Sequence, residues 1–126
     1  MIVIFTEPRD PHADLVESKL RARGEHVLRF DWADFPMRAS LSIEWRGADK
    51  HVVLRIAGAQ VDLTGCKSAW LRRPGKPQVS QDIEAPFLQG YVDEECFRVM
   101  QDTCNALDTR WLPGRFAAIR SRSRRP

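Results

Sequence analysis

The chain has 126 residues, of which 43% are hydrophobic and 29% are charged, and its formal net charge is +3. This length suits one domain with its own hydrophobic core and is too short for a two-domain enzyme. The sequence contains no signal-peptide pattern and no apolar run of the roughly 18 to 20 residues that a membrane span needs, so we expect a soluble, cytoplasmic protein.

The positive charge is concentrated near the end of the chain. Residues 1–108 contain all 17 acidic residues and 14 of the 20 basic ones, so this part has a net charge of −3. Residues 109–126 contain the other six basic residues, all arginines, and no acid. We expect such a tail to bind nucleic acid only non-specifically, through the phosphates.

The first third of the chain predicts a strand, a helix and a second strand. Residues 1–6 are almost wholly apolar, which is typical of a strand buried on both faces in a parallel sheet. Asp10 can cap a helix that begins at Pro11 and ends at Gly24. The apolar stripe of this helix consists of Leu15, Val16 and Leu20. Residues 26–32 resume strand character, which completes a βαβ unit.

The middle of the chain alternates apolar and polar residues, which predicts antiparallel strands. The alternation runs through residues 40–45 and again through residues 52–56, on either side of the turn-forming residues 46–50. Residues 61–63 offer a short third antiparallel piece. Residues 66–71 then read as a strand that returns to the parallel sheet.

A long helix is predicted over residues 85–107, where apolar residues recur every three or four positions. Residues 116–119 could begin another helix, and residues 121–126 lack any apolar residue, so we expect them to be disordered. The fold class is therefore α/β: a mixed sheet with a parallel core, an antiparallel hairpin extension and a long C-terminal helix.

The βαβ start raises the possibility of dinucleotide binding, with Asp31 placed as a ribose-binding acid. No glycine lies between Phe5 and Arg23, whereas the pyrophosphate-binding turn needs several. We therefore interpret Asp31 as a turn or capping residue.

No catalytic or metal-binding constellation is visible in the sequence. The three cysteines, Cys66, Cys96 and Cys104, form no C-x-x-C motif and are expected to be reduced. The three histidines share no ligand spacing with them. We expect no metal site and no catalytic residue.

The stretch SAWLRRPGKP, residues 68–77, places Trp70, Arg72 and Arg73 at the end of a predicted strand, with Lys76 shortly after. Ligands of open α/β sheets bind beyond the carboxyl ends of the strands, and guanidinium groups suit phosphate or carboxylate. In the alternative reading, Trp70 packs in the core and both arginines pair with acids of the same domain. The residues alone leave both readings open.

The ordered set of motifs resembles a known family. An IVIFT strand is followed by RARG and VLRFD, then FP at residues 35–36, a hairpin, AWLRRP at residues 69–74 and RWLPG at residues 110–114. This order is similar to the N-terminal pre-ATP-grasp domain of the ATP-grasp peptide maturases, the microviridin-type or graspetide ligases. The resemblance covers residues 1–120 and leaves residues 121–126 as an Arg/Ser-rich tail.

The resemblance implies part of a ligase that activates acidic side chains of a ribosomally made precursor peptide with ATP and magnesium and joins them to hydroxyl or amine side chains. Its partners would be the precursor peptide and the ATP-grasp catalytic domains, and it could form a homodimer. The family's nucleotide-binding lysines and magnesium-binding carboxylates have no counterpart here, so we expect neither a cofactor nor catalysis in this chain alone.

The resemblance also suggests which residues face the substrate cleft or a domain interface. They are Trp70, Arg72, Arg73 and Lys76, with Arg9 and Asp10 after the first strand. The Ser-Arg run that begins at Ser121 departs from the family and is expected to reflect a truncation or a shifted reading frame. The alternative function is a stand-alone scaffold or a weak nucleic-acid-binding protein that uses the tail.

Overall fold

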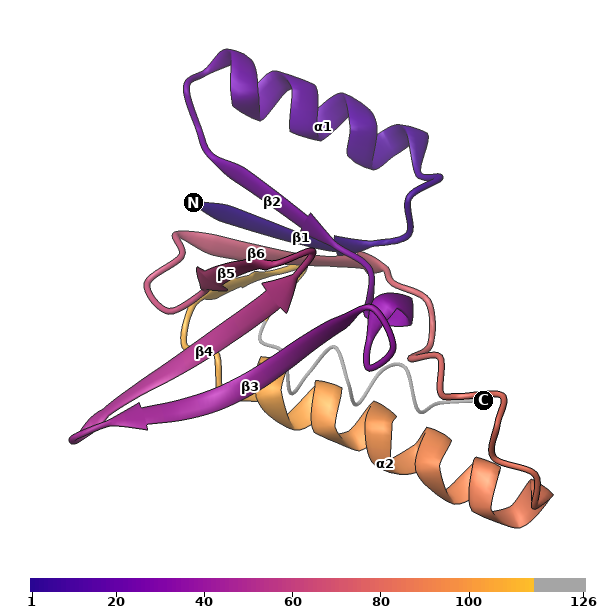
Figure 1. The fold of residues 1–126 in the computed structure, drawn as a ribbon. Helices are drawn as coiled ribbons and strands as arrows, with labels where there is room; N and C mark the ends of the chain where they lie inside the picture. The colour runs from indigo at the N-terminus through magenta and orange to yellow at the C-terminus, as the bar shows by residue number, and fades with distance from the viewer. Residues whose placement is uncertain (115–126) are drawn as a thin grey trace.

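The computed structural model describes residues 1–114, which form two sheets and two long helices (Figure 1). The helix predicted to begin within residues 116–119 and the disorder predicted for residues 121–126 lie outside the described residues. No helix formed by residues 1–114 combines the length and the hydropathy needed to cross a bilayer.

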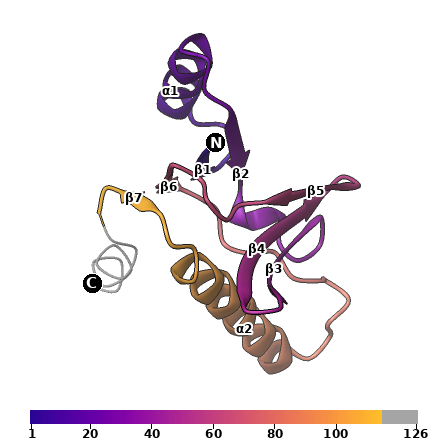
Figure 2. The ribbon, with the colours of Figure 1, turned by 90° about the vertical axis from the view of Figure 1, so that its left-hand side faces the viewer.

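The first sheet has four parallel strands in the order β2-β1-β6-β7. Its strands are β1 (Ile2–Thr6), β2 (Val27–Phe30), β6 (Ser68–Arg73) and β7 (Arg110–Leu112). Helix α1 (Pro11–Ala22) lies on one side of this sheet and α2 (Pro86–Asn105) on the other (Figure 2). The predicted βαβ start and the returning strand are confirmed. β7 was not predicted, because three residues are too few to show a period.

Helix α1 begins after a capping aspartate and ends shortly before a glycine. The Asp10 carboxylate accepts a hydrogen bond from the backbone N–H of Ala13, and Pro11 occupies the first turn, where its missing N–H is not needed. Gly24 follows the helix with a φ of +82°, a left-handed conformation that favours glycine. Leu15, predicted in the apolar stripe, is 56% exposed, so the helix buries a narrower face than its sequence implies.

The second sheet is antiparallel and has the order β3-β4-β5. Its strands are β3 (Ala39–Arg46), β4 (Asp49–Ile56) and β5 (Ala59–Asp62). β3 and β4 form the predicted hairpin, which turns at Gly47 with a φ of +65° and projects away from the parallel sheet in Figure 1. The predicted parallel core and antiparallel extension are both present, and they form separate sheets.

The main core lies between the parallel sheet, the antiparallel sheet and the end of α2. Aromatic rings dominate it: the ring of Phe5 stacks on that of Trp111 at 5.8 Å and meets Phe30 and Trp32 edge-on. Of the apolar stripe predicted for α2, the described structure buries Met100 and Cys104 in the second half. The first half of α2 is much more exposed.

A smaller apolar cluster lies on the other face of the parallel sheet, under α1. It consists of Ile4, Ala13 and Val27, with Leu20 and Trp70 packed against it. Side chains alternate along β6, so Ala69 contributes to the main core and Trp70 to this cluster. All three cysteines are free, as predicted.

Candidate functional site

The candidate site lies at the carboxyl edge of the parallel sheet, where β1 and β6 end side by side. The pairing register shifts there: Phe5 lies opposite Leu71, but Thr6 lies opposite Arg73. Arg72 is therefore the extra residue of a β-bulge. Bulges redirect side chains, and this one accompanies the approach of Arg72 to the loop that follows β1.

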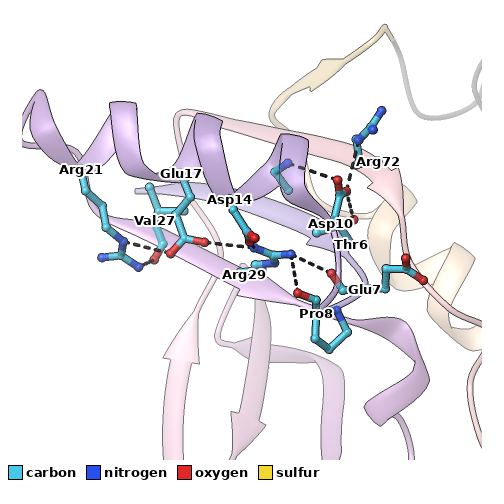
Figure 3. Close-up of polar contacts among 11 residues, drawn as sticks. Thr6, Glu7, Pro8, Asp10, Asp14, Glu17, Arg21, Val27, Arg29 and Arg72 are labelled. Carbon is cyan, nitrogen blue, oxygen red and sulfur yellow. Dashed lines mark hydrogen bonds and ion pairs between the residues drawn. The ribbon is translucent and has the colours of Figure 1, made fainter.

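The Asp10 side chain is the centre of a buried hydrogen-bond network. Its Oδ2 accepts from the Thr6 hydroxyl at 2.6 Å and from Arg72 Nε at 3.2 Å, and its Oδ1 accepts from the Ala13 N–H at 3.2 Å (Figure 3). Only 3% of the Asp10 surface is exposed. One carboxylate thus joins the end of β1, the start of α1 and the end of β6.

This network stabilises the charged form of Asp10. The Thr6 hydrogen bond is the largest cause that lowers the pKa of Asp10 from 3.8 to about 2; burial opposes it, and Ala13 and Arg72 add to the lowering. The carboxylate is therefore ionised at every physiological pH. It offers a fixed negative charge and no exchangeable proton for general acid or base chemistry.

Arg72 is largely engaged within the domain. Its guanidinium pairs with Asp10 and lies 5.7 Å from the centre of the Trp70 ring, a distance typical of a cation–π contact. Arg72 thus pairs with an acid of the same domain, as the alternative reading of the sequence expects. Trp70 is half-buried beside α1 and does not belong to the main core.

Arg29 also holds the loop between β1 and α1, from the side opposite Arg72. Its guanidinium donates to the backbone carbonyls of Glu7 and Pro8 and also contacts the carboxylates of Asp14 and Glu17 (Figure 3). The sequence reasoning missed this residue. The sequence does contain an indication of this role, because a lone arginine inside the apolar strand HVLRF needs hydrogen-bond acceptors nearby.

The other predicted site residues are exposed cations. Arg9 and Arg73 have no side-chain hydrogen bond or ion pair to residues within 1–114, although the Arg73 carbonyl accepts from the Glu7 N–H at 3.0 Å. Lys76 lies apart from them and lines a hollow of about 350 Å³ against α2, with Asp93, Glu94 and Phe97. The structure therefore brings Trp70, Arg72 and Asp10 together and leaves the three other cations outside their network.

Asp31 holds the loop that follows β6. Its Oδ1 accepts from the Gly75 N–H at 2.7 Å and from the Ala33 N–H at 3.2 Å, where it caps a short 3₁₀ helix (Trp32–Asp34). A Cβ added to Gly75 would lie 3.0 Å from the Cβ of Ala33, so glycine permits this approach. The predicted capping role of Asp31 is confirmed.

Within residues 1–114, no group of three or more His, Cys, Asp or Glu side chains is placed to hold a metal ion. The buried Cys104 thiol has a pKa raised beyond the range of physiological ionisation, because burial disfavours the thiolate, so it is no nucleophile. The edge can contact an anion through Arg9 and Arg73 and can position loops.

The family follows from a match over nearly the whole chain. The family model described as the MvdD pre-ATP grasp domain matches residues 1–118. The chain belongs to the MvdD pre-ATP-grasp family. No curated protein matches the sequence. The fold class and the family resemblance drawn from the motifs are thus both confirmed.

Several solved ATP-grasp ligases contain a domain similar to this chain. The macrocyclase MdnB of Microcystis aeruginosa MRC aligns with a TM-score of 0.80 and 22% identity, over 95% of this chain and 39% of its own. MdnC of the same organism, bound with precursor peptide MdnA, aligns with a TM-score of 0.76 and 21% identity, over 90% and 36%.

A third relative comes from Chryseobacterium gregarium. Its RiPP-associated ATP-grasp ligase, in complex with ADP and a leader and core peptide, aligns with a TM-score of 0.80 and 19% identity, over 90% of this chain and 34% of its own. The chain thus spans little more than a third of each of these three ligases. At these identities the likeness establishes the shared pre-ATP-grasp fold.

Proposed function

We propose that this chain serves as the pre-ATP-grasp domain of an ATP-grasp ligase that cross-links side chains of a ribosomally made precursor peptide. The match of the family model to residues 1–118 carries this proposal. The described domain contributes no catalytic group. Its role is to pack beside the catalytic domains and to form one wall of the substrate cleft.

We assign the carboxyl edge of the parallel sheet as the part of this domain that lines the substrate cleft. Ligands of open α/β sheets bind at this edge. The buried network around Asp10 joins β1 to β6 at this edge, and Arg9 and Arg73 remain exposed beside it. Their guanidinium groups suit the carboxylates of an acidic precursor peptide, which are the groups that such a ligase would activate.

ATP and magnesium would bind in the catalytic domains, and the precursor peptide would bind between those domains and this one. Among relatives of known structure, the PsnB ligase was solved with a minimal precursor, magnesium and ADP, which are the kinds of ligand that this proposal invokes. We accordingly expect the chain alone to hydrolyse ATP only at background rate in the presence of magnesium and an acidic peptide. Robust turnover would refute a non-catalytic role.

A peptide titration tests the cleft assignment directly. The ¹⁵N-labelled chain is titrated with a glutamate-rich peptide and with the same peptide carrying glutamine, and amide shifts are followed by NMR. We expect shifts near residues 7–10 and 72–76 for the glutamate peptide only. Arg9→Gln with Arg73→Gln should weaken binding about two- to fivefold, the size expected for exposed ion pairs.

A matched control is available at the tip of the β3–β4 hairpin. Arg46 is also exposed and lies far from the carboxyl edge, so Arg46→Gln should leave the peptide affinity unchanged. If Arg46→Gln weakens binding as much as the edge variant, the attraction is general and the cleft assignment is wrong. If binding disappears when residues 115–126 are removed, a deletion that leaves β7 and the core residue Trp111 in place, the basic tail is the anion site instead.

A further inference from the structure

The parallel sheet carries an apolar groove on the face under α1. α1 packs over the β2 side of the sheet, while β6 and β7 extend beyond it (Figure 2). Between α1 and these two strands lies a groove of about 310 Å³. Its lining residues are Ile2, Ile4, Val16, Leu20, Ser68, Trp70 and Leu112. All of them except Ser68 are apolar, so the groove suits a hydrocarbon chain.

One end of the groove lies beside an exposed arginine of β7. Paired residues of neighbouring strands point to the same face of a sheet, and side chains alternate along each strand. Ser68 pairs with Arg110, and Trp70 pairs with Leu112. Trp111 points into the main core on the opposite face, so Arg110 and Leu112 both point to the face under α1. The exposed Arg110 therefore lies beside Ser68, at the amino end of the groove.

The end of α1 adds a second arginine at the same place. Arg23 lies seven residues, about two helical turns, after the groove-lining Val16, so it follows the same side of the helix. The segment after α1 returns to the amino edge of the sheet, where the Ile2 N–H donates to the His26 carbonyl at 2.8 Å. Arg23 and Arg110 thus lie at the same end of the groove.

The charges of these two arginines are not neutralised by the part of the chain that the structure describes. Among residues 1–114, the side chains of Arg23 and Arg110 have no hydrogen bond or ion pair. The nearby carboxylate of Glu25 is already bound by Lys67 Nζ at 2.9 Å. Guanidinium groups suit carboxylate and phosphate oxygens. The groove therefore combines an apolar floor with two cations and the Ser68 hydroxyl at one end.

We propose that this groove binds a single-chain anionic amphiphile, such as a fatty carboxylate. The carboxylate would lie at the end that carries Arg23 and Arg110, and the hydrocarbon chain would extend over Trp70 toward Leu112. The arginines decide the class of ligand, because they attract an anionic head group and repel a cationic one. The site lies on the face under α1, away from the carboxyl edge of the sheet, so it does not depend on the ligase role.

A titration with three eight-carbon amphiphiles tests the ligand class. The ¹⁵N-labelled full chain is titrated with octanoate, octanol and octylamine below their micelle-forming concentrations, and amide shifts are followed by NMR. We expect octanoate to shift residues 68–70 and 110–112 and to bind at least about tenfold tighter than octylamine. From hexanoate to decanoate, each added methylene should tighten binding about two- to fourfold. Equal binding of octanoate and octylamine, or shifts confined to residues 7–10, would overturn the proposal.

Variants separate the head-group end of the groove from its floor. Arg23→Gln with Arg110→Gln should weaken octanoate binding about three- to tenfold and leave octanol binding unchanged. Leu112→Asp should weaken binding of both at least about tenfold, because it places a charge beside the hydrocarbon chain. All three side chains are exposed, so both variants should fold, which circular dichroism verifies.

Matched controls lie outside the groove. Leu15→Asp changes a leucine that is 56% exposed, against 47% for Leu112, and Arg46→Gln removes an exposed arginine of the hairpin. Neither should change octanoate affinity. If either control weakens binding as much as its groove counterpart, the attraction is general and the site is wrong. The proposal also fails if removal of residues 115–126 abolishes octanoate binding, or if the chain binds phosphatidylglycerol vesicles but not octanoate.

Discussion

At the scale of single residues, Asp10 shows how a helix cap can also join strands. Its carboxylate caps α1 by accepting from the Ala13 N–H. It also accepts from the hydroxyl of Thr6, the last residue of β1, and pairs with Arg72 of β6. The sequence indicates the first of these roles, since aspartate before proline is a common helix start. The other two depend on contacts between residues distant in sequence, which a linear pattern does not contain.

Replacing this charge should cost stability in a pH-dependent way. Asp10→Asn keeps one oxygen but loses the charge, and we expect it to lower the free energy of unfolding at pH 7 by about 1 to 3 kcal/mol. The pKa of Asp10 is lowered from 3.8 to about 2 in the folded state. The contribution is thus fully present above pH 4 and is lost as the pH falls toward 2.

Urea unfolding at pH 7, 4, 3 and 2 measures this effect. The difference between wild type and Asp10→Asn should shrink over the last two steps. Asp49→Asn, at an exposed position on the hairpin, provides the control for a simple change of net charge. A difference that stays constant with pH would show that the charge of Asp10 does not stabilise the fold.

At the scale of elements, α2 differs between its two halves. The first half carries exposed apolar residues, whereas the second half buries Met100 and Cys104 against the aromatic core. The heptad-like spacing predicts the helix and its length well. It does not predict which half is covered, because burial depends on where the sheets end relative to the helix.

Two neighbouring residues in the second half of α2 distinguish its buried face from its exposed face. Met100 is fully buried, and Val99 is 43% exposed. We expect Met100→Ala to lower the free energy of unfolding by about 2 to 5 kcal/mol, because it leaves a cavity. Val99→Ala should change it by no more than about 0.5 kcal/mol. Equal costs in chemical unfolding would mean that Val99 is covered in solution.

Strands were predictable in proportion to their length and pattern. The alternation in β3 and β4 and the apolar run of β1 gave both the strands and their type of pairing. β7 escaped prediction because Arg110–Leu112 is held by pairing with β6 and by the burial of Trp111, not by any repeating pattern. At the candidate site, the sequence predicted that Arg72 and Arg73 lie at the end of a strand. It did not predict that Arg29 binds the loop between β1 and α1.

At the scale of the whole molecule, the two sheets share one core. Phe5 of the parallel sheet contacts Trp111, and the same cluster includes Leu41 and Leu54 of the antiparallel sheet. The two sheets should therefore unfold together. A single cooperative transition is expected for a domain of this size.

Trp111→Ala tests this shared dependence. The side chain is 8% exposed, stacks on Phe5 and donates from its indole nitrogen to the Leu107 carbonyl. We expect its loss to lower the free energy of unfolding by about 3 to 5 kcal/mol. Trp45→Ala, which removes the same side chain at a 67% exposed position, should have little effect. Calorimetry that resolves two separate transitions would contradict the shared core.

The stacking of Trp111 on Phe5 also bears on biosynthesis. Phe5 is synthesised well before its aromatic partner, which is added 106 positions later. Until then, the central strand of the sheet lacks a large part of its apolar cover. The nascent polypeptide must therefore hold β1 with an incomplete apolar cover, a target for chaperones, until translation has passed Trp111.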